Sequence, residues 1–320
     1  MRILLLQLDG KLPNVALMRI AAHHRALGDE IELRTSCPSE QPSLFDARWD
    51  KIYASAIFER SKPLVERVLQ YWPAAIVGGT GWDVRTSLED FGITTLTQDY
   101  TIYPDFRRSI GFTMRGCRFR CPFCVVPRKE GPPRQERTIL DLWRGEPTPR
   151  ELLLLDNDFF GQPGWRERAR DIRDGRFRVC FTQGINFRTL SDEQAEALAS
   201  LDYRDDSMQT KRLYTAWDNP KDGERLFAGL RRLVHYGVRP DSIMVYMLIG
   251  YWPGETHQHR EERRQQLREF GARPYPMPYC RTPELIGYQR WVIRRADLKC
   301  TWEDFRAARY RPERVKIATV

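Results

Sequence analysis

The sequence has no apolar run that approaches the ~20 residues of a membrane-spanning helix. It also contains no low-complexity tract, and 41% of its residues are apolar while 30% are charged. This composition argues against a disordered chain and against a membrane partner. The opening stretch MRILLLQLDG reaches an acidic residue after a few apolar ones, which favours a first strand over a secretory signal.

The chain lacks the even, closely spaced cysteine set of a small disulfide-stabilised domain. Its seven cysteines are an odd number in a chain of 320 residues, so a secreted disulfide scaffold is not expected. A reducing compartment suits these thiols, and we expect a cytoplasmic protein. Acidic residues are the minority charge, 43 against 52 basic ones, which leaves a net charge of +9. This balance favours anionic partners such as nucleic acid or nucleotides, or else an arginine-rich surface without a specific partner.

Residues 1–95 alternate between strand-like and helix-like patterns, which is typical of a small parallel α/β layer. We expect a Rossmann-like domain there, followed at 96–109 by a linker that is polar, aromatic and interrupted by proline. The expected strands are 2–8, 30–35, 50–58 and 74–82, and the expected helices are 14–28 and 63–72.

From residue 110 to residue 280, strand-like runs recur with helical patterns between them. Each strand leads through a helix to the next, so right-handed crossovers would build a parallel sheet that is curved or closed. Six such strands suit a partial barrel, and 281–320 would form a short helical C-terminal extension. The predicted fold class is therefore α/β. The expected strands are 110–115, 151–157, 177–184, 211–218, 241–250 and 273–279, and the expected helices are 191–201, with a capping box from Ser191 and Gln194, 223–237 and 256–271.

Polar or reactive side chains follow several of these strands, at or just beyond the predicted strand end. Because chemistry gathers at the carboxyl ends of parallel strands, we expect these side chains to share one edge of the sheet. They are Cys117, Asp156, Gln183, Asp218 and Tyr251.

Three cysteines lie within eight positions of the segment GFTMRGCRFRCPFC, at Cys117, Cys121 and Cys124. Thiolates in a loop are the ligands of iron–sulfur clusters, and three of them leave one iron of a 4Fe-4S cluster open for a substrate or cofactor. A structural zinc site would need a fourth ligand, and the next cysteine, Cys180, is far along the chain. The CPFC pair alone also suits a dithiol redox site, which does not need Cys117. Buried core cysteines would not cluster in an arginine-rich loop.

The C-x3-C-x2-C loop, at the end of the first strand of a β/α partial barrel, resembles the radical S-adenosylmethionine (SAM) superfamily. Phe123, just before the last cysteine, matches the aromatic residue that the superfamily prefers there. The resemblance covers roughly residues 110–280 and implies a partial (β/α)6 barrel. It also implies that the cysteines hold a 4Fe-4S cluster whose open iron binds SAM, and that reductive cleavage of SAM yields a 5′-deoxyadenosyl radical that abstracts hydrogen from a substrate. An electron donor such as flavodoxin or ferredoxin would supply the electron.

The same resemblance suggests which residues would hold SAM. The second strand of the family commonly ends in a Gly-Gly-Glu-like segment, whereas this chain has LLDNDFFG, with acidic residues but no glycine pair. An acidic side chain suits the ammonium group of SAM, and a turn rich in Asp and Asn is the plain alternative. Arg188 would meet the SAM carboxylate and Asp218 a ribose hydroxyl. The expected cofactor-binding residues are Phe123, Asp156, Asn157, Asp158, Gln183, Arg188, Asp218 and Gly250.

A Rossmann-like domain before such a barrel resembles the cobalamin-binding class of the superfamily. The segment VGGTGW at 77–82 is similar to the glycine-rich turn that approaches the nucleotide tail of cobalamin, where glycine permits close backbone approach. The chain lacks the Asp-x-His-x-x-Gly loop that supplies a cobalt ligand, and QLDGKLPN stands in its place. His23 and His24 fall within an expected helix, where surface or packing roles are favoured. Cobalamin binding therefore competes with a scaffold role for this domain.

Basic residues crowd the cysteine loop, and aromatic residues follow the predicted strands. The basic residues suit an electron donor, phosphates or a raised cluster potential, and the aromatic residues suit base stacking or core packing. We expect a radical SAM enzyme, with nucleic acid or a nucleotide as the substrate that the charge favours. The alternatives are cobalamin-dependent methyl transfer and a non-catalytic, metal-binding nucleic-acid module. The two sets are Arg115, Arg118, Arg120, Arg128, Lys129, Arg134 and Arg137, and Tyr214, Trp217, Tyr251, Trp252 and Tyr279.

Overall fold

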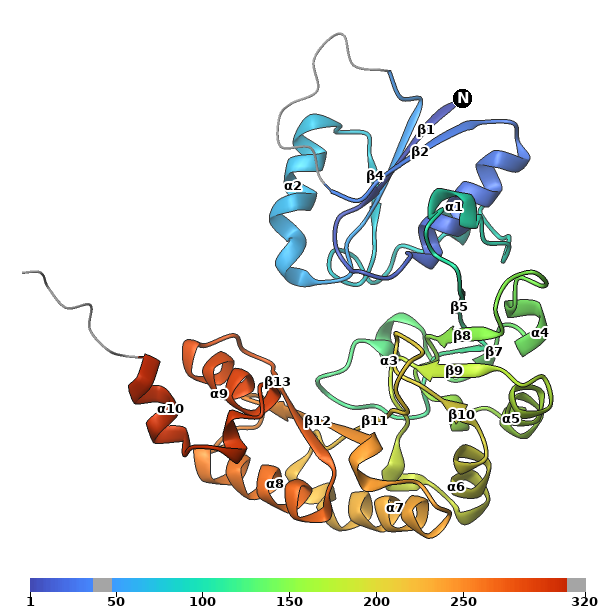
Figure 1. The fold of residues 1–320 in the computed structure, drawn as a ribbon. Helices are drawn as coiled ribbons and strands as arrows, with labels where there is room; N and C mark the ends of the chain where they lie inside the picture. The colour runs from blue at the N-terminus through green and yellow to red at the C-terminus, as the bar shows by residue number, and fades with distance from the viewer. Residues whose placement is uncertain (37–47, 310–320) are drawn as a thin grey trace, which may run out of the picture. The chain divides into compact units, whose positions relative to one another are not determined.

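The computed structural model describes residues 1–36 and 48–309 (Figure 1). The chain is an α/β protein with parallel sheets, as the sequence predicts, and it divides into two compact units, Met1–Asp156 and a second that begins at Asn157. None of the helices in the described ranges is long and apolar enough to cross a membrane. The division falls within the predicted barrel segment, and the boundaries that the sequence suggests at 95/96, 109/110 and 280/281 stay predictions.

The first unit begins with a four-stranded parallel sheet in the order β2-β1-β3-β4. Every strand and both helices that the sequence predicts for this region are present. Successive residues of β1 point to opposite faces, so Ile3 and Leu5 pack with α1 while Leu4 and Leu6 pack with α2. The elements are β1 (Arg2–Gln7), α1 (Val15–Ala26), β2 (Glu30–Arg34), β3 (Lys51–Ser55), η1 (Glu59–Ser61), α2 (Lys62–Tyr71) and β4 (Ile76–Gly78).

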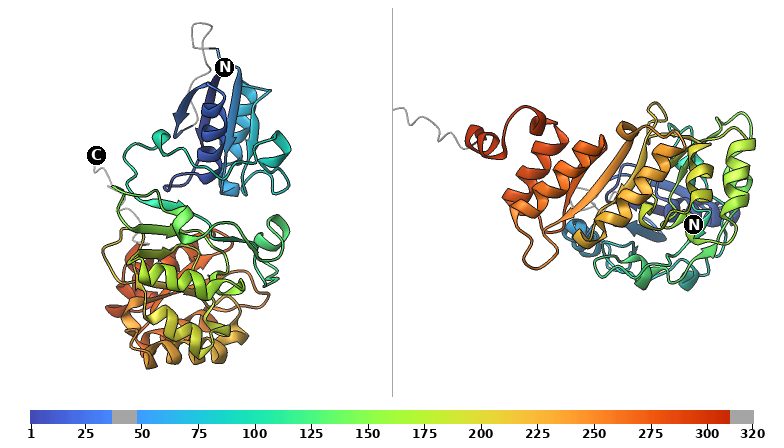
Figure 2. Two further views of the ribbon diagram at one scale, coloured as in Figure 1. Left: turned by 90° about the vertical axis from the view of Figure 1, so that its right-hand side faces the viewer. Right: turned by 90° about the horizontal axis from the view of Figure 1, so that it is seen from below.

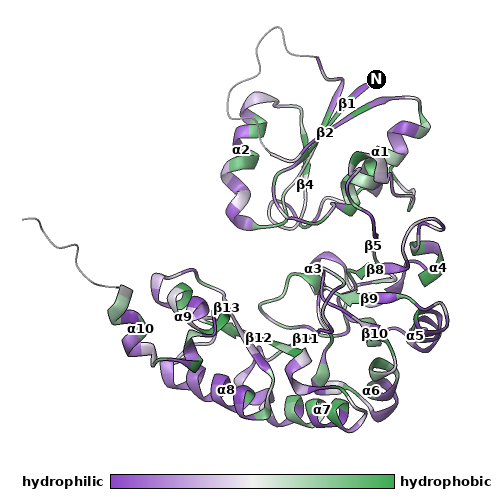
Figure 3. Ribbon diagram, in the orientation of Figure 1, coloured by the Kyte–Doolittle hydropathy of each residue, from purple (hydrophilic) through white to green (hydrophobic). Residues whose placement is uncertain are grey.

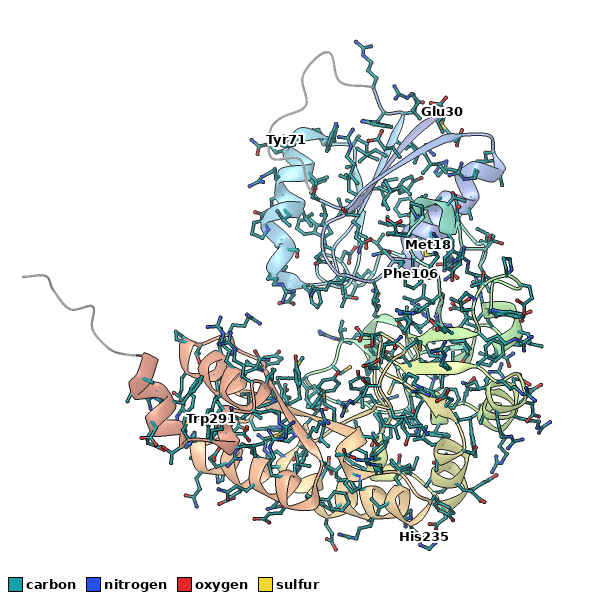
Figure 4. The ribbon with its side chains drawn as sticks, in the orientation of Figure 1. Met18, Glu30, Tyr71, Phe106, His235 and Trp291 are labelled. Atoms are coloured by element: carbon teal, nitrogen blue, oxygen red, sulfur yellow. The ribbon has the colours of Figure 1, made fainter. Side chains whose placement is uncertain are left out.

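The two helices cover the two faces of this sheet. Figure 4 shows Met18 on α1 and Tyr71 on α2 lying on opposite sides of the strands. The four apolar residues of β1 are fully buried, and each such side chain stabilises the fold by about 1.5–3 kcal/mol relative to exposure. The apolar run RILLLQ is thus explained by a strand that is buried on both faces.

The rest of the first unit contains a parallel strand pair and an antiparallel ladder. Strand β5 pairs with β8, so that Gly111 lies opposite Leu154, and β6 pairs with β7 in the antiparallel sense. The β6–β7 ladder joins the two ends of the cysteine-containing segment. The elements are η2 (Glu89–Phe91), η3 (Tyr100–Ile102), β5 (Ser109–Gly111), β6 (Met114–Arg115), α3 (Val126–Lys129), β7 (Arg134–Gln135), α4 (Ile139–Leu142) and β8 (Glu151–Leu154).

The second unit contains two sets of parallel strands with helices between them. Strands β9 and β10 pair with each other, and β11, β12 and β13 form a three-stranded sheet in that order. Ser191 and Gln194 form the predicted capping box at the start of α6. The elements are η4 (Phe159–Gly161), α5 (Trp165–Asp174), β9 (Arg178–Phe181), η5 (Phe187–Thr189), α6 (Asp192–Ala199), β10 (Asp202–Tyr203), β11 (Leu213–Ala216), η6 (Pro220–Asp222), α7 (Gly223–His235), η7 (Pro240–Ser242), β12 (Ile243–Ile249), α8 (His257–Phe270), β13 (Arg273–Pro278), α9 (Pro283–Ile293), η8 (Ala296–Leu298) and α10 (Trp302–Arg309).

The helices α7 and α8 lie along the same side of the strands β11–β13, as the two further views of Figure 2 also show. They bury different kinds of residue. Helix α7 buries Leu226, Leu230 and Leu233 at helical spacing, whereas the mostly hydrophilic α8 (Figure 3) buries Arg260, Arg263 and Arg264. The buried guanidinium groups of α8 are paired with carboxylates, which offsets the cost of removing their charges from water.

Candidate functional site

The cysteine loop is the segment 116–133, between β6 and β7. Its two arms meet backbone to backbone, because the Cys117 amide donates to the Gly131 carbonyl over 3.1 Å. Gly116 has a φ of +80°, and a Cβ at that position would lie 2.2 Å from the Pro132 carbonyl oxygen. A glycine is therefore required at the position directly before the first cysteine.

The three cysteines of this loop line one hollow of about 500 Å³. Each of them is half-buried, and the Cys124 amide donates to the Cys121 carbonyl over 3.0 Å in a tight turn. The lining contains no carboxylate and no imidazole, and its other members are basic residues, prolines and a glycine. Thiol donors of this kind suit iron–sulfur clusters and soft metals better than hard cations. The donor chemistry therefore fits a cluster.

The three cysteine side chains are nevertheless too far apart to form a metal site as they stand. Within residues 1–36 and 48–309, no group of three or more His, Cys, Asp or Glu side chains is gathered closely enough to hold a metal ion. The loop thus brings the three thiols to one hollow without closing them into a coordination set. Phe123, the residue before the last of them, is half-buried in the same loop.

The basic residues around the loop divide into two kinds. Arg115 is engaged within the protein, because its guanidinium pairs with Glu130 at 3.0 Å and with Glu136 at 3.7 Å. Lys129 donates to the Thr80 hydroxyl over 2.7 Å, and burial lowers the pKa of Lys129. In contrast, Arg120 and Arg128 are exposed and line the hollow. The exposed pair therefore gives the rim of the hollow a positive charge.

The glycines of the segment VGGTGW are explained by packing within the first unit. A Cβ on Gly79 would lie 2.3 Å from the Ala56 carbonyl oxygen, and one on Gly81 would lie 2.4 Å from the Phe58 backbone. These contacts require glycine without any ligand, so the glycines do not argue for a bound nucleotide tail. Cobalamin binding stays a prediction.

His24 has the packing role that the sequence favours. Its ring is buried between Asp29, at 2.7 Å, and the Tyr53 hydroxyl, at 3.0 Å. Burial lowers the pKa of His24, although the hydrogen bond to Asp29 opposes that shift.

Asp156 lies two residues beyond the end of β8, as predicted, and its carboxylate contacts the backbone of its own unit. It accepts hydrogen bonds from the Thr113 amide at 2.7 Å, from the Met114 amide at 3.2 Å and from the Thr113 hydroxyl. Burial raises the pKa of Asp156 to about 6, against the effect of these donors. The residue therefore joins the end of β8 to the strand that leads into the cysteine loop.

Asn157 and Asp158 open the second unit. Asp158 is buried, and its carbonyl accepts a hydrogen bond from the Gly161 amide over 2.8 Å at the start of η4. A Cβ on Gly161 would lie 2.1 Å from the Asp158 carboxylate, so glycine is needed beside it. Asn157 is half-buried.

Arg188 and Asp218 lie near each other in the second unit. Arg188 forms an ion pair with Asp222, and its backbone amide donates to the Asn186 side chain over 3.1 Å. Burial raises the pKa of Asp218 to about 6, and the charges of Arg188 and Arg263 oppose that shift. Gln183, also predicted as a contact, is exposed two residues beyond β9.

A buried ion pair that the sequence did not suggest lies at the carboxyl ends of β11 and β12. Arg263 pairs with Glu255, and both side chains are 3% exposed. Arg263 also donates to the carbonyls of Trp217 at 3.1 Å and Leu248 at 3.0 Å, while Glu255 accepts from the Gly250 amide at 2.5 Å. The pair thus holds the backbone around Gly250 in place.

No family model and no curated protein matches the chain.

Proposed function

We propose that the chain is a radical SAM enzyme in which Cys117, Cys121 and Cys124 hold a 4Fe-4S cluster. The observation that carries the proposal is the C-x3-C-x2-C loop, whose three cysteines line one hollow. The loop follows the parallel strand β5 and is closed by the antiparallel ladder β6–β7. The finer architecture belongs to the same proposal: a Rossmann-like domain, a partial (β/α)6 barrel and a short C-terminal extension.

The cluster and SAM, when bound, would supply the one-electron cleavage of a carbon–sulfur bond and the hydrogen abstraction that follows. The chain's own residues would position them. Gly116 allows the two arms of the loop to close, and Asp156 anchors the strand before the loop. In the second unit, Asp218, with a pKa raised by burial, and the ion-paired Arg188 offer groups of both charges to SAM.

The remaining proposed SAM contacts differ in whether their polar groups already form hydrogen bonds within the protein. Gln183 is exposed at the end of its strand, and the Gly250 amide is taken by Glu255. Asp156 is directed at backbone amides. We therefore expect Asp218 and Gln183 to contribute more to SAM affinity than Asp156.

The proposal is tested by anaerobic reconstitution with iron and sulfide, followed by incubation with SAM and dithionite. We expect about four irons per chain and formation of 5′-deoxyadenosine. Alanine at position 117, 121 or 124 should abolish both, whereas Cys280→Ala, at an exposed cysteine outside the loop, should change neither. Stoichiometric zinc without iron would contradict the proposal, and full activity of Cys117→Ala would favour the dithiol site.

An acidic electron-transfer protein such as flavodoxin or ferredoxin is the proposed reductant. The exposed Arg120 and Arg128 at the rim of the hollow support this partner, because a positive rim attracts a negative surface toward the cysteines.

A further inference from the structure

Three tyrosines stand side by side on one face of the sheet β11-β12-β13. The strand register places Tyr246 opposite Ala216 on one side and opposite Tyr275 on the other, and Tyr214 precedes Ala216 by two residues. Because side chains alternate along a strand, all three tyrosines project from the same face. The alternate residues, among them Val245 and Pro274, are buried on the opposite face.

The three rings form a corner. The rings of Tyr214 and Tyr246 are parallel within 5°, with centroids 5.8 Å apart. The ring of Tyr275 stands at 89° to that of Tyr246, with centroids 5.3 Å apart. The parallel pair therefore offers an outer face on which a flat ring can stack, beside the perpendicular ring of Tyr275.

The hydroxyl groups of these tyrosines have no hydrogen-bond partner in the described part of the chain, although all three residues are half-buried. Other tyrosines of the chain do find partners: the Tyr103 hydroxyl donates to Gln7 at 2.6 Å, and the Tyr288 hydroxyl donates to Glu261 at 2.6 Å. The three hydroxyls are therefore not used within the described part of the chain and are available to donate to, or accept from, a bound ligand.

The electrostatics of this face favour a neutral ligand with hydrogen-bond donors. Burial raises the pKa of Tyr246 to about 12 and also raises the pKa of Tyr214, so both phenols are neutral and can donate or accept. The charges of Asp205 and Asp206 act on Tyr214 and raise its pKa too. A bound anion would be repelled by these carboxylates, whereas ring N–H groups would be favoured.

We propose that this tyrosine face binds the nucleobase ring of the substrate. The base stacks on an outer face of the Tyr214–Tyr246 pair, and the phenol hydroxyls meet the donors and acceptors on its edge. The inference deepens the proposed function, because it names the substrate of the hydrogen abstraction as a molecule that carries a purine or pyrimidine.

The test uses the full chain as isolated, without added cluster or SAM, and titrates it calorimetrically with adenosine, guanosine, cytidine and uridine. At least one nucleoside should bind, and Tyr246→Ala should weaken that binding about 10- to 100-fold, as expected for the loss of one stacking partner. Tyr246→Phe and Tyr275→Phe keep the rings and remove one hydroxyl each, so we expect a loss of about 3- to 10-fold. Tyr236→Phe, just beyond α7, is the matched control and should leave the affinity unchanged.

SAM also carries an adenine, and a parallel titration with SAM and with 5′-deoxyadenosine separates the two sources of the ring. If these two alone bind and Tyr246→Ala weakens them, the face holds the cofactor and the proposal is overturned. Nucleoside binding that is absent, or that is equal in wild type and Tyr→Phe variants with unchanged circular dichroism, overturns it as well. A chain that takes up no iron would end the proposed function and leave this titration unaffected.

Discussion

The Asp156 carboxylate accepts hydrogen bonds from two backbone amides and one hydroxyl, and the residue is only 3% exposed. Its partners, Thr113 and Met114, begin the segment that leads to the cysteine loop. A single side chain therefore joins the end of β8 to the segment that precedes the loop, and its protonation state affects the stability of this connection.

The pH dependence of stability should report on Asp156. Its pKa rises from 3.8 to about 6 on folding, so the folded chain binds more protons than the unfolded chain between those values. The contribution of Asp156 is therefore complete below pH 3.8 and is lost as the pH rises through about 6. The unfolding free energy of the wild type should fall as the pH rises across this window, and in Asp156→Asn this fall should be smaller by about 3 kcal/mol. Urea denaturation at several pH values measures the difference.

Asp174→Asn, at the exposed end of α5, is the surface control for this measurement. An Asp156→Asn variant whose unfolding free energy falls with pH as steeply as that of the wild type would show that burial does not raise this pKa.

At the level of elements, apolar patterns located most of the fold. The strand runs at 2–8, 151–157 and 241–250 each contain an observed strand, because each is a continuous apolar run that is buried in a parallel sheet. Helix α5 was missed because its buried face includes Arg168, which is 1% exposed, and a buried arginine hides the apolar period. Strand β7 was missed because Arg134 and Gln135 are exposed and polar.

The candidate site was predictable only where its residues are close in sequence. The three cysteines reach one hollow because a short loop carries all of them. The pair Arg188–Asp222 joins two separate short helices, and the pair Arg263–Glu255 depends on how the loop before α8 folds back on that helix, so no local pattern marks either pair. For the same reason, the tyrosine face emerged only from the register of three strands.

The glycine-rich segment at the end of β4 and just beyond it offers a paired test of backbone packing. Gly81→Ala places a Cβ within 2.4 Å of the Phe58 backbone, while Gly78→Ala places one where nothing lies within 4 Å. We expect Gly81→Ala to lower the free energy of unfolding by about 1–3 kcal/mol and Gly78→Ala to change it far less, as measured by chemical denaturation. Equal effects would mean that close packing is not what requires Gly81.

At the level of the whole molecule, part of the net charge of +9 is concentrated at the cysteine loop, where exposed arginines line the hollow. Arg120→Glu/Arg128→Glu should slow reduction of the reconstituted protein by flavodoxin about 10-fold or more, because steering by opposite charge is lost. Reduction by dithionite should not slow, since a small reductant needs no docking surface. Stopped-flow spectroscopy at low ionic strength measures both rates.

The control for the charge itself is Arg225→Glu/Arg231→Glu on α7, where both side chains are exposed. It makes the same change in net charge away from the loop. If it slows flavodoxin as much as the loop variant does, or if added salt leaves the wild-type rate unchanged, the rim is not the docking surface.

The ladder between β6 and β7 has a consequence for any metal or cluster that the proposed function places in the loop. In the strand register, Arg115 lies opposite Arg134 at the base of the cysteine loop. Just inside the loop, the Cys117 amide donates a hydrogen bond to the Gly131 carbonyl. Folding therefore already includes the loss of conformational entropy that closes the loop, before any ligand binds. A metal or cluster that enters the loop would then need to order only side chains, so the folded chain is expected to capture it faster than an unstructured peptide with the same three cysteines.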